Sequence, residues 1–203
     1  MVELILVRHG ETEWNKKFRY QGSSDIPLSE KGINQARLVG EQLRYKRVSR
    51  IISSDLQRAV KTAEFIARYH SLRVEEMEEF RELDFGRWEG LTYEEVRQRH
   101  PDDLIKWEQC PYNFHPTGGE SLAEVYKRVI RGFEYICASA VSEERIVIVT
   151  HAGPIRIILG WVLGITHYPK NINIDYGSIS IIRKFMDYYF VEKVNFTSVF
   201  SSG

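Results

Sequence analysis

Short apolar runs alternate along the chain with longer segments in which apolar side chains recur every three or four positions. Continuous runs such as residues 3–8 and 145–150 are typical of strands buried on both faces. The segments 29–43, 56–66 and 121–140 place their apolar side chains on one side of a helix. This pattern predicts an α/β fold in which helices cover both faces of a mostly parallel sheet.

The remaining periodic segments complete the predicted sheet and its layers. Apolar runs predict a strand at 48–53 and a short strand at 72–74, and a further helix is expected at 154–163. Two β-rich runs, 178–185 and 188–196, end the pattern, and their aromatic residues are expected in the core or on a sheet face. The predicted architecture is a three-layer α/β/α sandwich.

One stretch, about residues 80–120, interrupts the alternation. It holds Gly86, Gly90, the Gly118-Gly119 pair and several prolines, which favour loops and short helices. Such an excursion is suited to cover the edge of a sheet where ligands bind. We therefore expect a single domain over residues 1–203 with a small cap inserted above the C-terminal edge of its sheet.

Composition permits this fold and narrows the function classes. The 203 residues suffice for one substantial core, and 28 basic residues balance 28 acidic ones. This balance gives no indication of a nucleic-acid or membrane partner. Cys110 and Cys137 lack metal-type or CxxC spacing, and no charged-then-apolar leader precedes the first strand. A reducing, cytoplasmic setting is expected.

Two histidines mark the candidate site, because His9 and His151 each directly follow a predicted buried strand. Ligands of parallel sheets gather outside the carboxyl ends of the strands, where both imidazoles would reach the same rim. A lone histidine at a strand end is more often a core or loop residue. The neighbouring residues therefore decide the interpretation.

These neighbours favour an anion. Arg8 supplies a fixed cation beside His9, Gly10 a permissive backbone and Asn15 an amide. Arg58 falls in the first turn of a predicted helix, with Asp55 or Ser54 as the expected N-cap. Because helix N-termini carry free N–H groups and partial positive charge, Arg58 would arrive where phosphate is already favoured.

In these residues the chain resembles the histidine phosphatase superfamily, which includes cofactor-dependent phosphoglycerate mutases and many small-molecule phosphatases. The resemblance spans nearly the whole sequence, and its motifs occur in the family's order. They are Arg8-His9-Gly10-Glu11-Thr12, Asn15, Gln21-Gly22, Pro27-Leu28-Ser29, Ser54 to Ala63, Arg81 to Gly86, Gly118-Gly119-Glu120-Ser121 and Thr150-His151. Each motif alone is weak, whereas the ordered set is specific.

The resemblance implies a mechanism. His9 attacks phosphorus in line and forms a phosphohistidine that water hydrolyses. Arg8 and Arg58 neutralise the phosphate charge, and His151 stays protonated beside it. Glu82 is the expected proton donor to the leaving group, although a charged run such as 78–84 is usually just a solvated face.

Further contacts to substrate are expected from Asn15, Gln21, Gly22 and the backbone around Ala152, although Asn15 and Gln21 also suit a turn. No His, Cys and carboxylate cluster has metal spacing, so we predict a mechanism without metal or cofactor. The other histidines are interpreted as surface residues: His70, His100, His115 and His167.

Three functions compete: a phosphatase for a small phosphomonoester, a phosphoglycerate mutase, and a non-catalytic phosphate-binding module. The module is disfavoured because every catalytic position carries a competent residue. Mutases of the family hold the substrate carboxylate partly through a Trp-Arg-Arg segment, where this chain has Trp107-Glu108-Gln109. Phe85 also replaces a tyrosine of the mutases. Hydrolysis is therefore favoured.

Among phosphatases, the segments Phe85 to Gly90 and Gly118 to Ser121 resemble those of α-ribazole phosphatases and of the superfamily's phosphoserine phosphatases. Both α-ribazole 5′-phosphate and phosphoserine are candidate substrates. The expected partner is this small phosphomonoester, with no nucleic acid and no membrane. The β-rich C-terminal runs offer an edge through which a homodimer could form.

Overall fold

The computed structural model describes residues 1–197, so residues 198–203 of the predicted domain lie outside the described part. The strands are β1 (Val2–Arg8), β2 (Arg50–Ser53), β3 (Val74–Glu76), β4 (Arg145–Thr150), β5 (Ile179–Phe185) and β6 (Tyr188–Phe196). The helices are α1 (Glu13–Lys16), α2 (Glu30–Leu43), α3 (Gln57–Ala67), α4 (Tyr93–Arg99), α5 (Pro101–Gln109), α6 (Leu122–Ser139) and α7 (Ala152–Val162), with 3-10 turns η1 (Glu78–Phe80) and η2 (Gly86–Trp88).

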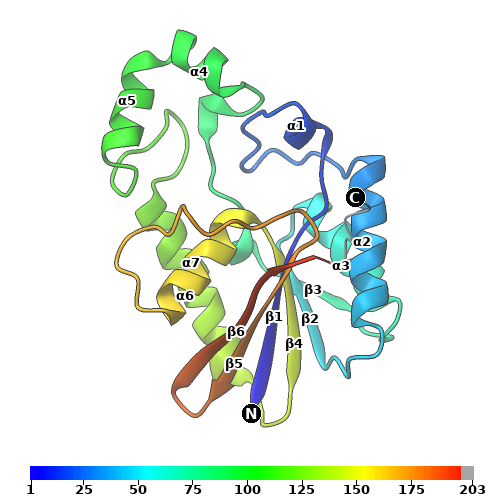
Figure 1. Ribbon diagram of the computed structural model, residues 1–203. Coiled ribbons are helices and arrows are strands. Elements are labelled where there is room, and N and C mark those ends of the chain that lie inside the picture. Colours follow the sequence, from blue (N-terminus) through cyan, green and yellow to red (C-terminus); the bar gives the residue numbers. More distant parts are fainter. Residues whose placement is uncertain (198–203) are drawn as a thin grey trace.

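The strands form one sheet in the order β3-β2-β4-β1-β5-β6 (Figure 1). The first four strands of this order run parallel, β5 is antiparallel to β1, and β6 is antiparallel to β5. In the parallel pair of β1 and β4, Arg8 lies directly opposite Thr150. The residues that follow, His9 and His151, therefore emerge side by side at the carboxyl ends of two central strands.

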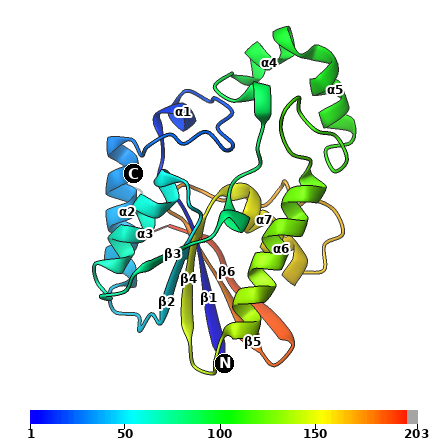
Figure 2. The same cartoon turned by 180° about the vertical axis from the view of Figure 1, so that it is seen from behind.

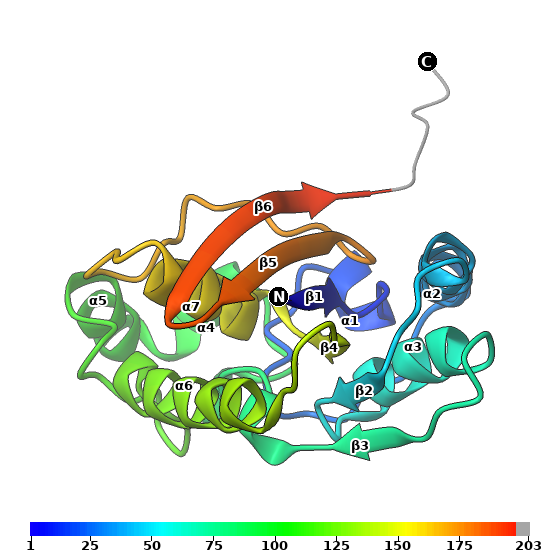
Figure 3. The same ribbon diagram turned by 90° about the horizontal axis from the view of Figure 1, so that it is seen from below.

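Helices cover both faces of the sheet, which confirms the predicted sandwich. Figure 3 shows α2 and α3 on one side and α6 and α7 on the other. Successive residues of β4 alternate between the layers: Ile146 and Ile148 pack toward α6 and α7, whereas Val147 and Val149 pack toward α2 and α3. Each such buried side chain contributes about 1.5–3 kcal/mol relative to exposure.

The cap lies above the carboxyl ends of the parallel strands. Figures 1 and 2 show α4 and α5 at this end of the sheet in two opposite views. The segment has a small core of its own, in which Trp88, Val96 and Leu104 are buried. Tyr20 and Trp107 pack against this core. The cap thus brings aromatic side chains over the edge where the two histidines emerge.

Several element boundaries differ from the prediction. β2 begins at Arg50 rather than 48, and β3 spans 74–76 rather than 72–74. α7 begins at Ala152, which makes His151 its N-cap residue. Pro154 is then the third residue of α7, and proline is tolerated in a first turn because its missing N–H has no partner within the helix. The early start brings the N-terminus of α7 to the predicted site.

The predicted N-cap of α3 is wrong. The N-cap residue is Leu56, whose side chain accepts no hydrogen bond. The Asp25 carboxylate instead accepts the Gln57 backbone N–H at 2.7 Å. Asp55 forms an ion pair with Arg81, and the Ser54 hydroxyl lies against His151, so tertiary partners occupy both side chains. Arg58 is nevertheless in the first turn of α3, as predicted.

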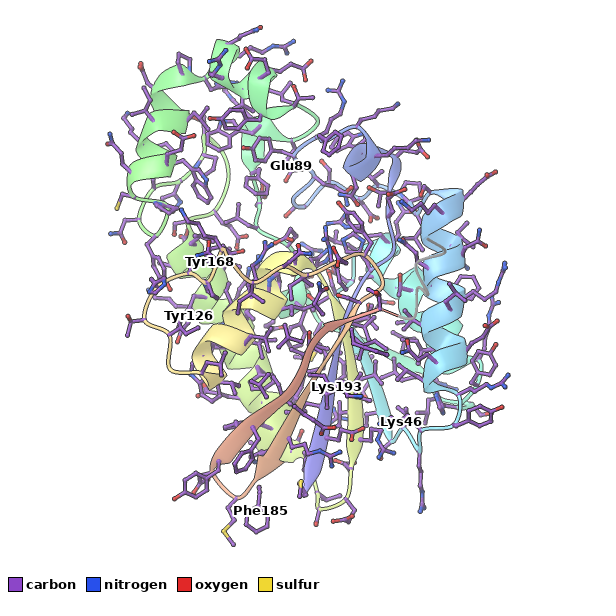
Figure 4. The ribbon with its side chains drawn as sticks, in the orientation of Figure 1. Lys46, Glu89, Tyr126, Tyr168, Phe185 and Lys193 are labelled. Atoms are coloured by element: carbon purple, nitrogen blue, oxygen red, sulfur yellow. The ribbon has the colours of Figure 1, made fainter. Side chains whose placement is uncertain are left out.

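Aromatic residues of the β5–β6 hairpin lie against the core or on the exposed surface of the hairpin. Tyr189 packs on Trp161 of α7 with ring centroids 5.2 Å apart. Phe185, Tyr188 and Phe190 are exposed. Phe185 lies at the end of the sheet opposite the cap (Figure 4), so this exposed group is remote from the histidines.

Candidate active site

The two histidine rings meet in the interior, as their sequence positions predicted. The ring centroids of His9 and His151 are 4.9 Å apart, with the planes inclined at 61°. Both side chains are buried. The parallel pairing of β1 and β4 fixes this approach, because the His9 backbone N–H donates to the carbonyl of Thr150 at 3.0 Å.

The surroundings of His9 favour a neutral imidazole with one free nitrogen. Its Nδ1 lies 2.6 Å from the carbonyl oxygen of Gly10, so a protonated Nδ1 donates to that oxygen. Nε2 then carries the lone pair. Burial, together with the charges of Arg58 and Arg8, lowers the pKa of His9 well below its usual value. At neutral pH His9 is therefore uncharged, with an unprotonated Nε2.

His151 is also held neutral by the protein. Its Nδ1 accepts a hydrogen bond from Arg58 Nε at 3.3 Å, and its Nε2 lies 3.0 Å from the Ser54 hydroxyl. Burial and the Arg58 charge lower its pKa well below the usual value. The expected protonated His151 is therefore not a property of the protein surroundings alone. Protonation requires the added negative charge of a phosphate, which raises an imidazole pKa.

Arg8 presents an unused donor in the interior. Its Nη1 donates to the carbonyl of Ile174 at 2.5 Å, and the guanidinium lies 3.7 Å from the ring centroid of Tyr176. Within the described residues, its buried Nε has no hydrogen-bond partner. Burial lowers the pKa of Arg8, which nevertheless stays charged at neutral pH. An anion would satisfy the free donor.

Arg58 is fully buried, and backbone carbonyls hold it in place. Its Nη2 donates to Gly22 at 2.6 Å, and its Nη1 donates to Ser24 at 2.7 Å. Gly22 has a φ of +53°, a conformation that glycine adopts at little cost. Burial lowers the pKa of Arg58 to about 10, so the side chain stays charged at neutral pH.

Gln21 and Asn15 have structural partners. In the orientation that satisfies its amide, Gln21 Nε2 donates to the Thr12 hydroxyl, and Oε1 lies 2.6 Å from Arg58 Nε. The single Arg58 Nε–H is then shared between Gln21 Oε1 and the more distant His151 Nδ1. Asn15 Oδ1 accepts from the Thr12 backbone N–H at 3.1 Å and forms the capping box of α1. The interpretation as turn residues thus describes Asn15 well, and substrate contact by either residue stays a prediction.

Glu82 sits at the N-terminus of α7. Its Oε2 accepts from the Gly153 N–H at 3.2 Å, and its Oε1 accepts from the Leu83 N–H at 2.9 Å. A Cβ at position 153 would lie 2.2 Å from Glu82 Oε1, so only glycine allows this approach. The predicted contact residue Ala152 is the first residue of the same helix. The carboxylate and the helix N-terminus therefore lie at one place.

The acidic neighbours of Glu82 point elsewhere. Glu78, Glu79 and Asp84 line a separate, strongly charged hollow of about 340 Å³, together with Arg81 and Arg128. Asp84 also accepts a hydrogen bond from the Gly86 N–H at 2.7 Å. Glu82 is thus distinguished from the charged run in which the sequence embeds it.

A second cavity, of about 200 Å³, opens beside Glu82 and Gly153. Its other lining residues are Tyr20, Leu83, Phe85, Trp107, Leu122, Val125, Arg156, Ile157 and Tyr168. Figure 4 shows Tyr168 on the segment that follows α7, below the cap. The walls are mostly apolar and aromatic, which suits the organic part of a ligand.

Among the described residues that line this cavity Arg156 is the one cation, and the sequence did not predict it. Its Nε donates to the carbonyl of Ile172 at 2.8 Å, and among residues 1–197 no carboxylate forms a salt bridge with it. A signal was available, because Arg156 is the single charged residue of the apolar helix α7. Tyr176, which stacks on Arg8, was also missed, and its position in a loop gave no periodic signal.

Glu89 supports the site from the cap. Its carboxylate accepts the backbone N–H groups of Ser23 at 2.7 Å, Ser24 at 2.8 Å and Phe85 at 3.2 Å. Figure 4 shows Glu89 on the side of the cap that faces α1. The contact fixes the Ser24 carbonyl that receives Arg58.

The remaining histidines lie outside the site. His115 and His167 are exposed, whereas His70 and His100 are only half-buried. His115 Nδ1 lies 3.2 Å from a Glu124 oxygen. Between residues 1 and 197, no group of three or more His, Cys, Asp or Glu side chains is arranged to hold a metal ion. No described helix is long and apolar enough to cross a membrane.

Residues 4–197 match the histidine phosphatase superfamily (branch 1), and the chain belongs to this family, as its motifs predicted. It is 41% identical over 165 residues to phosphoserine phosphatase 1 of Hydrogenobacter thermophilus, and the aligned region covers 81% of this chain and 78% of that protein. It is 36% identical over 178 residues to the probable phosphoglycerate mutase GpmB of Cronobacter sakazakii, with 84% and 79% covered. A putative alpha-ribazole-5′-P phosphatase structure from Escherichia coli matches with a TM-score of 0.90 at 25% identity, covering 96% of each chain. The protein is a phosphoric monoester hydrolase of the histidine phosphatase type.

The buried neutral histidines predict a pH dependence of stability. In the unfolded chain both imidazoles gain protons near pH 6.5, whereas in the folded state their pKa values are lower. As pH falls below about 6.5, each histidine should therefore lower the free energy of unfolding by about 1.4 kcal/mol per pH unit. Denaturant unfolding between pH 7.5 and 5 measures this slope.

The variant His151→Asn should reduce the pH dependence of the free energy of unfolding by the contribution of one histidine, about 1.4 kcal/mol per pH unit. Substitution of exposed His167 is the control and should leave this dependence unchanged. An unchanged slope in His151→Asn would contradict the assignment of a buried neutral imidazole.

Proposed function

We propose that the protein hydrolyses a small phosphomonoester through a phosphohistidine at His9. The observation that carries the proposal is the neutral His9, whose Nε2 is free and whose pKa responds to the charges of Arg8 and Arg58. A phosphomonoester carries nearly two negative charges, which these guanidinium groups would neutralise before attack. The bond from phosphorus to the leaving oxygen breaks as the bond to Nε2 forms.

Two further groups complete the proposed cycle. Glu82, in its protonated form, donates its proton to the leaving oxygen and then, as a carboxylate, accepts a proton from the water that attacks the phosphohistidine. The Ala152 N–H, at the first position of α7, would donate to a phosphate oxygen, because a helix N-terminus favours negative charge. His151 becomes protonated on phosphate binding and stabilises charge on the equatorial oxygens.

For the substrate, we propose a leaving group that carries a carboxylate, as phosphoserine does. Arg156 lines the cavity beside Glu82, and no carboxylate of residues 1–197 forms a salt bridge with it. Arginine binds carboxylates well through its planar fork of donors. The 41% identity to a protein named phosphoserine phosphatase 1 supports the same choice.

A second candidate is α-ribazole 5′-phosphate. Tyr20, Phe85, Trp107 and Tyr168 give the cavity four aromatic walls, on which a flat heterocycle could stack. The structural match to the putative alpha-ribazole-5′-P phosphatase supports this alternative. The two candidate substrates differ in their leaving groups, because that of phosphoserine carries a carboxylate for Arg156 to bind and that of α-ribazole 5′-phosphate does not.

The mutase alternative is disfavoured at the cap. Where the mutases have two arginines, this chain has Glu108, whose carboxylate accepts the Tyr93 hydroxyl at 2.8 Å, and the exposed Gln109. Neither Glu108 nor Gln109 supplies the positive charge that would bind the carboxylate of phosphoglycerate. Phosphate release should therefore exceed exchange between 2- and 3-phosphoglycerate when 2,3-bisphosphoglycerate is added.

Activity on a substrate panel tests the proposal. We expect Arg156→Met to raise KM for phosphoserine by about 10–100-fold, the range for loss of a charged hydrogen bond. Hydrolysis of p-nitrophenyl phosphate should change little, because that substrate has no carboxylate. Arg99→Met, in the cap, is the matched control for removal of a positive charge.

Faster turnover of α-ribazole 5′-phosphate than of phosphoserine, insensitive to Arg156→Met, would favour the second candidate. Exchange of phosphoglycerates that outpaces phosphate release would favour the mutase.

A further inference from the structure

Arg128 of α6 uses all five of its N–H donors. Its Nη1 donates to the carbonyls of Glu79 at 2.9 Å and Arg81 at 2.7 Å. Its Nη2 donates to the carbonyl of Glu82 at 2.9 Å. The remaining two bonds, from Nε and Nη2, reach the two carboxylate oxygens of Glu120 at 2.8 Å. One side chain thus holds three carbonyls of the segment that ends at Glu82.

Glu120 ties this segment to the cap. In addition to Arg128, its Oε2 accepts the backbone N–H of Asp84 at 3.1 Å. The Glu120 N–H in turn donates to the Asp84 carbonyl at 2.9 Å. Asp84 lies where the chain enters the cap and Glu120 where it leaves, so the two ends of the insertion are joined at this point.

We propose that the Arg128–Glu120 pair is a positioning device for Glu82. Only the α-carbon and two methylene groups separate the clamped Glu82 carbonyl from its carboxyl carbon, whose oxygens rest on the N–H groups of Leu83 and Gly153. Fixing the backbone therefore fixes where the proton is delivered. The same bonds link that position to the base of the cap. The proposal rests on the role of Glu82 as proton donor in the proposed function.

The contact pattern differs from that of an ordinary surface ion pair, which contributes little. The Arg128 side chain is only 17% exposed, and three of its bonds go to neutral carbonyls rather than to the opposite charge. Arg131, about one turn further along α6, is 73% exposed, and its one salt bridge within residues 1–197 is with Glu79 at 3.4 Å. Lysine at position 128 would keep the charge and lose the planar fork of donors.

Leaving-group dependence tests the device. The variants are Arg128→Met, Arg128→Lys and Glu120→Gln, with Arg131→Met as the matched control and Glu82→Gln as the reference for loss of the acid. Each is assayed with two substrates. Phosphoserine has a poor leaving group, the serine alkoxide, whereas the leaving group of p-nitrophenyl phosphate needs little protonation. Melting temperatures of all five variants show how far each substitution affects the fold.

We expect kcat for phosphoserine to fall by about 10–100-fold in the variants at positions 128 and 120. General acid catalysis typically accelerates a reaction by about 10²–10⁴-fold, and a misplaced acid loses much of that acceleration. The value for p-nitrophenyl phosphate should fall less than about threefold, and KM should change little. Glu82→Gln should show the same dependence more strongly, and Arg131→Met should resemble the unmodified protein.

Equal losses for both substrates in Arg128→Lys and Glu120→Gln would show that the pair supports only the fold, and would overturn the proposal. So would unchanged kcat in these variants while Glu82→Gln remains sensitive to the leaving group. If Glu82→Gln itself shows no leaving-group dependence, both the role of Glu82 and the positioning proposal are wrong, whereas phosphate release from p-nitrophenyl phosphate tests the hydrolysis separately.

Discussion

His9→Ala should abolish both turnover and covalent labelling by substrate. In the unmodified protein, brief incubation with labelled substrate and a quench without acid should trap one phosphoryl group that survives alkali and is lost in acid. The reason is the free Nε2 of His9, since its Nδ1 is held by the Gly10 carbonyl. Removal of a nucleophile costs at least on the order of 10⁴-fold in kcat.

His167→Ala, at an exposed position, is the control and should keep both label and turnover. Label that is stable in acid would indicate a phosphoserine, and Ser54 beside His151 would be the first residue to examine. Substantial turnover in a folded His9→Ala protein would contradict the nucleophile assignment.

The main elements of the fold could be predicted because local sequence and tertiary structure agree. Residues 4–7 and 146–149 are apolar throughout, and the structure buries both strands between helical layers. Once two parallel strands are adjacent, the positions of His9 and His151 follow from their register. Boundaries such as the start of α7 could not be predicted, because the helix continues over Gly153 and Pro154 to meet Glu82.

The chemistry of the site was less accessible to sequence reasoning than its residue list. Arg58 and His151 were predicted, but the neutral state of His151 depends on burial and on the 3.3 Å contact between them. Arg156 and Arg128 were missed because their roles depend on which backbone carbonyls and cavity walls they meet after folding. Local patterns do not encode contacts between segments so distant in the chain.

Arg58→Met should lower kcat/KM by about 10³-fold, or about 4 kcal/mol of transition-state stabilisation, with a similar loss of vanadate affinity. Arg58 is buried and charged, and it contacts the His151 ring directly. In a buried site a guanidinium stabilises phosphate charge far more than it would in water. Steady-state kinetics and vanadate inhibition measure the two losses.

The structural share of this effect needs its own measurement, because Arg58→Met also leaves the carbonyls of Gly22 and Ser24 without their donors. Each buried carbonyl left without a hydrogen-bond donor lowers the free energy of unfolding by about 1–3 kcal/mol. Arg58→Lys keeps the positive charge but loses the planar fork of donors. Its kcat/KM and vanadate affinity should therefore lie between those of Arg58→Met and those of the unmodified protein. Arg68→Met, at the exposed C-terminal end of the same helix, should change neither activity nor vanadate affinity. If folded Arg58→Met protein keeps full vanadate affinity, the charge of Arg58 is not part of the phosphate site, and the neutralisation of phosphate would then rest on Arg8 and protonated His151.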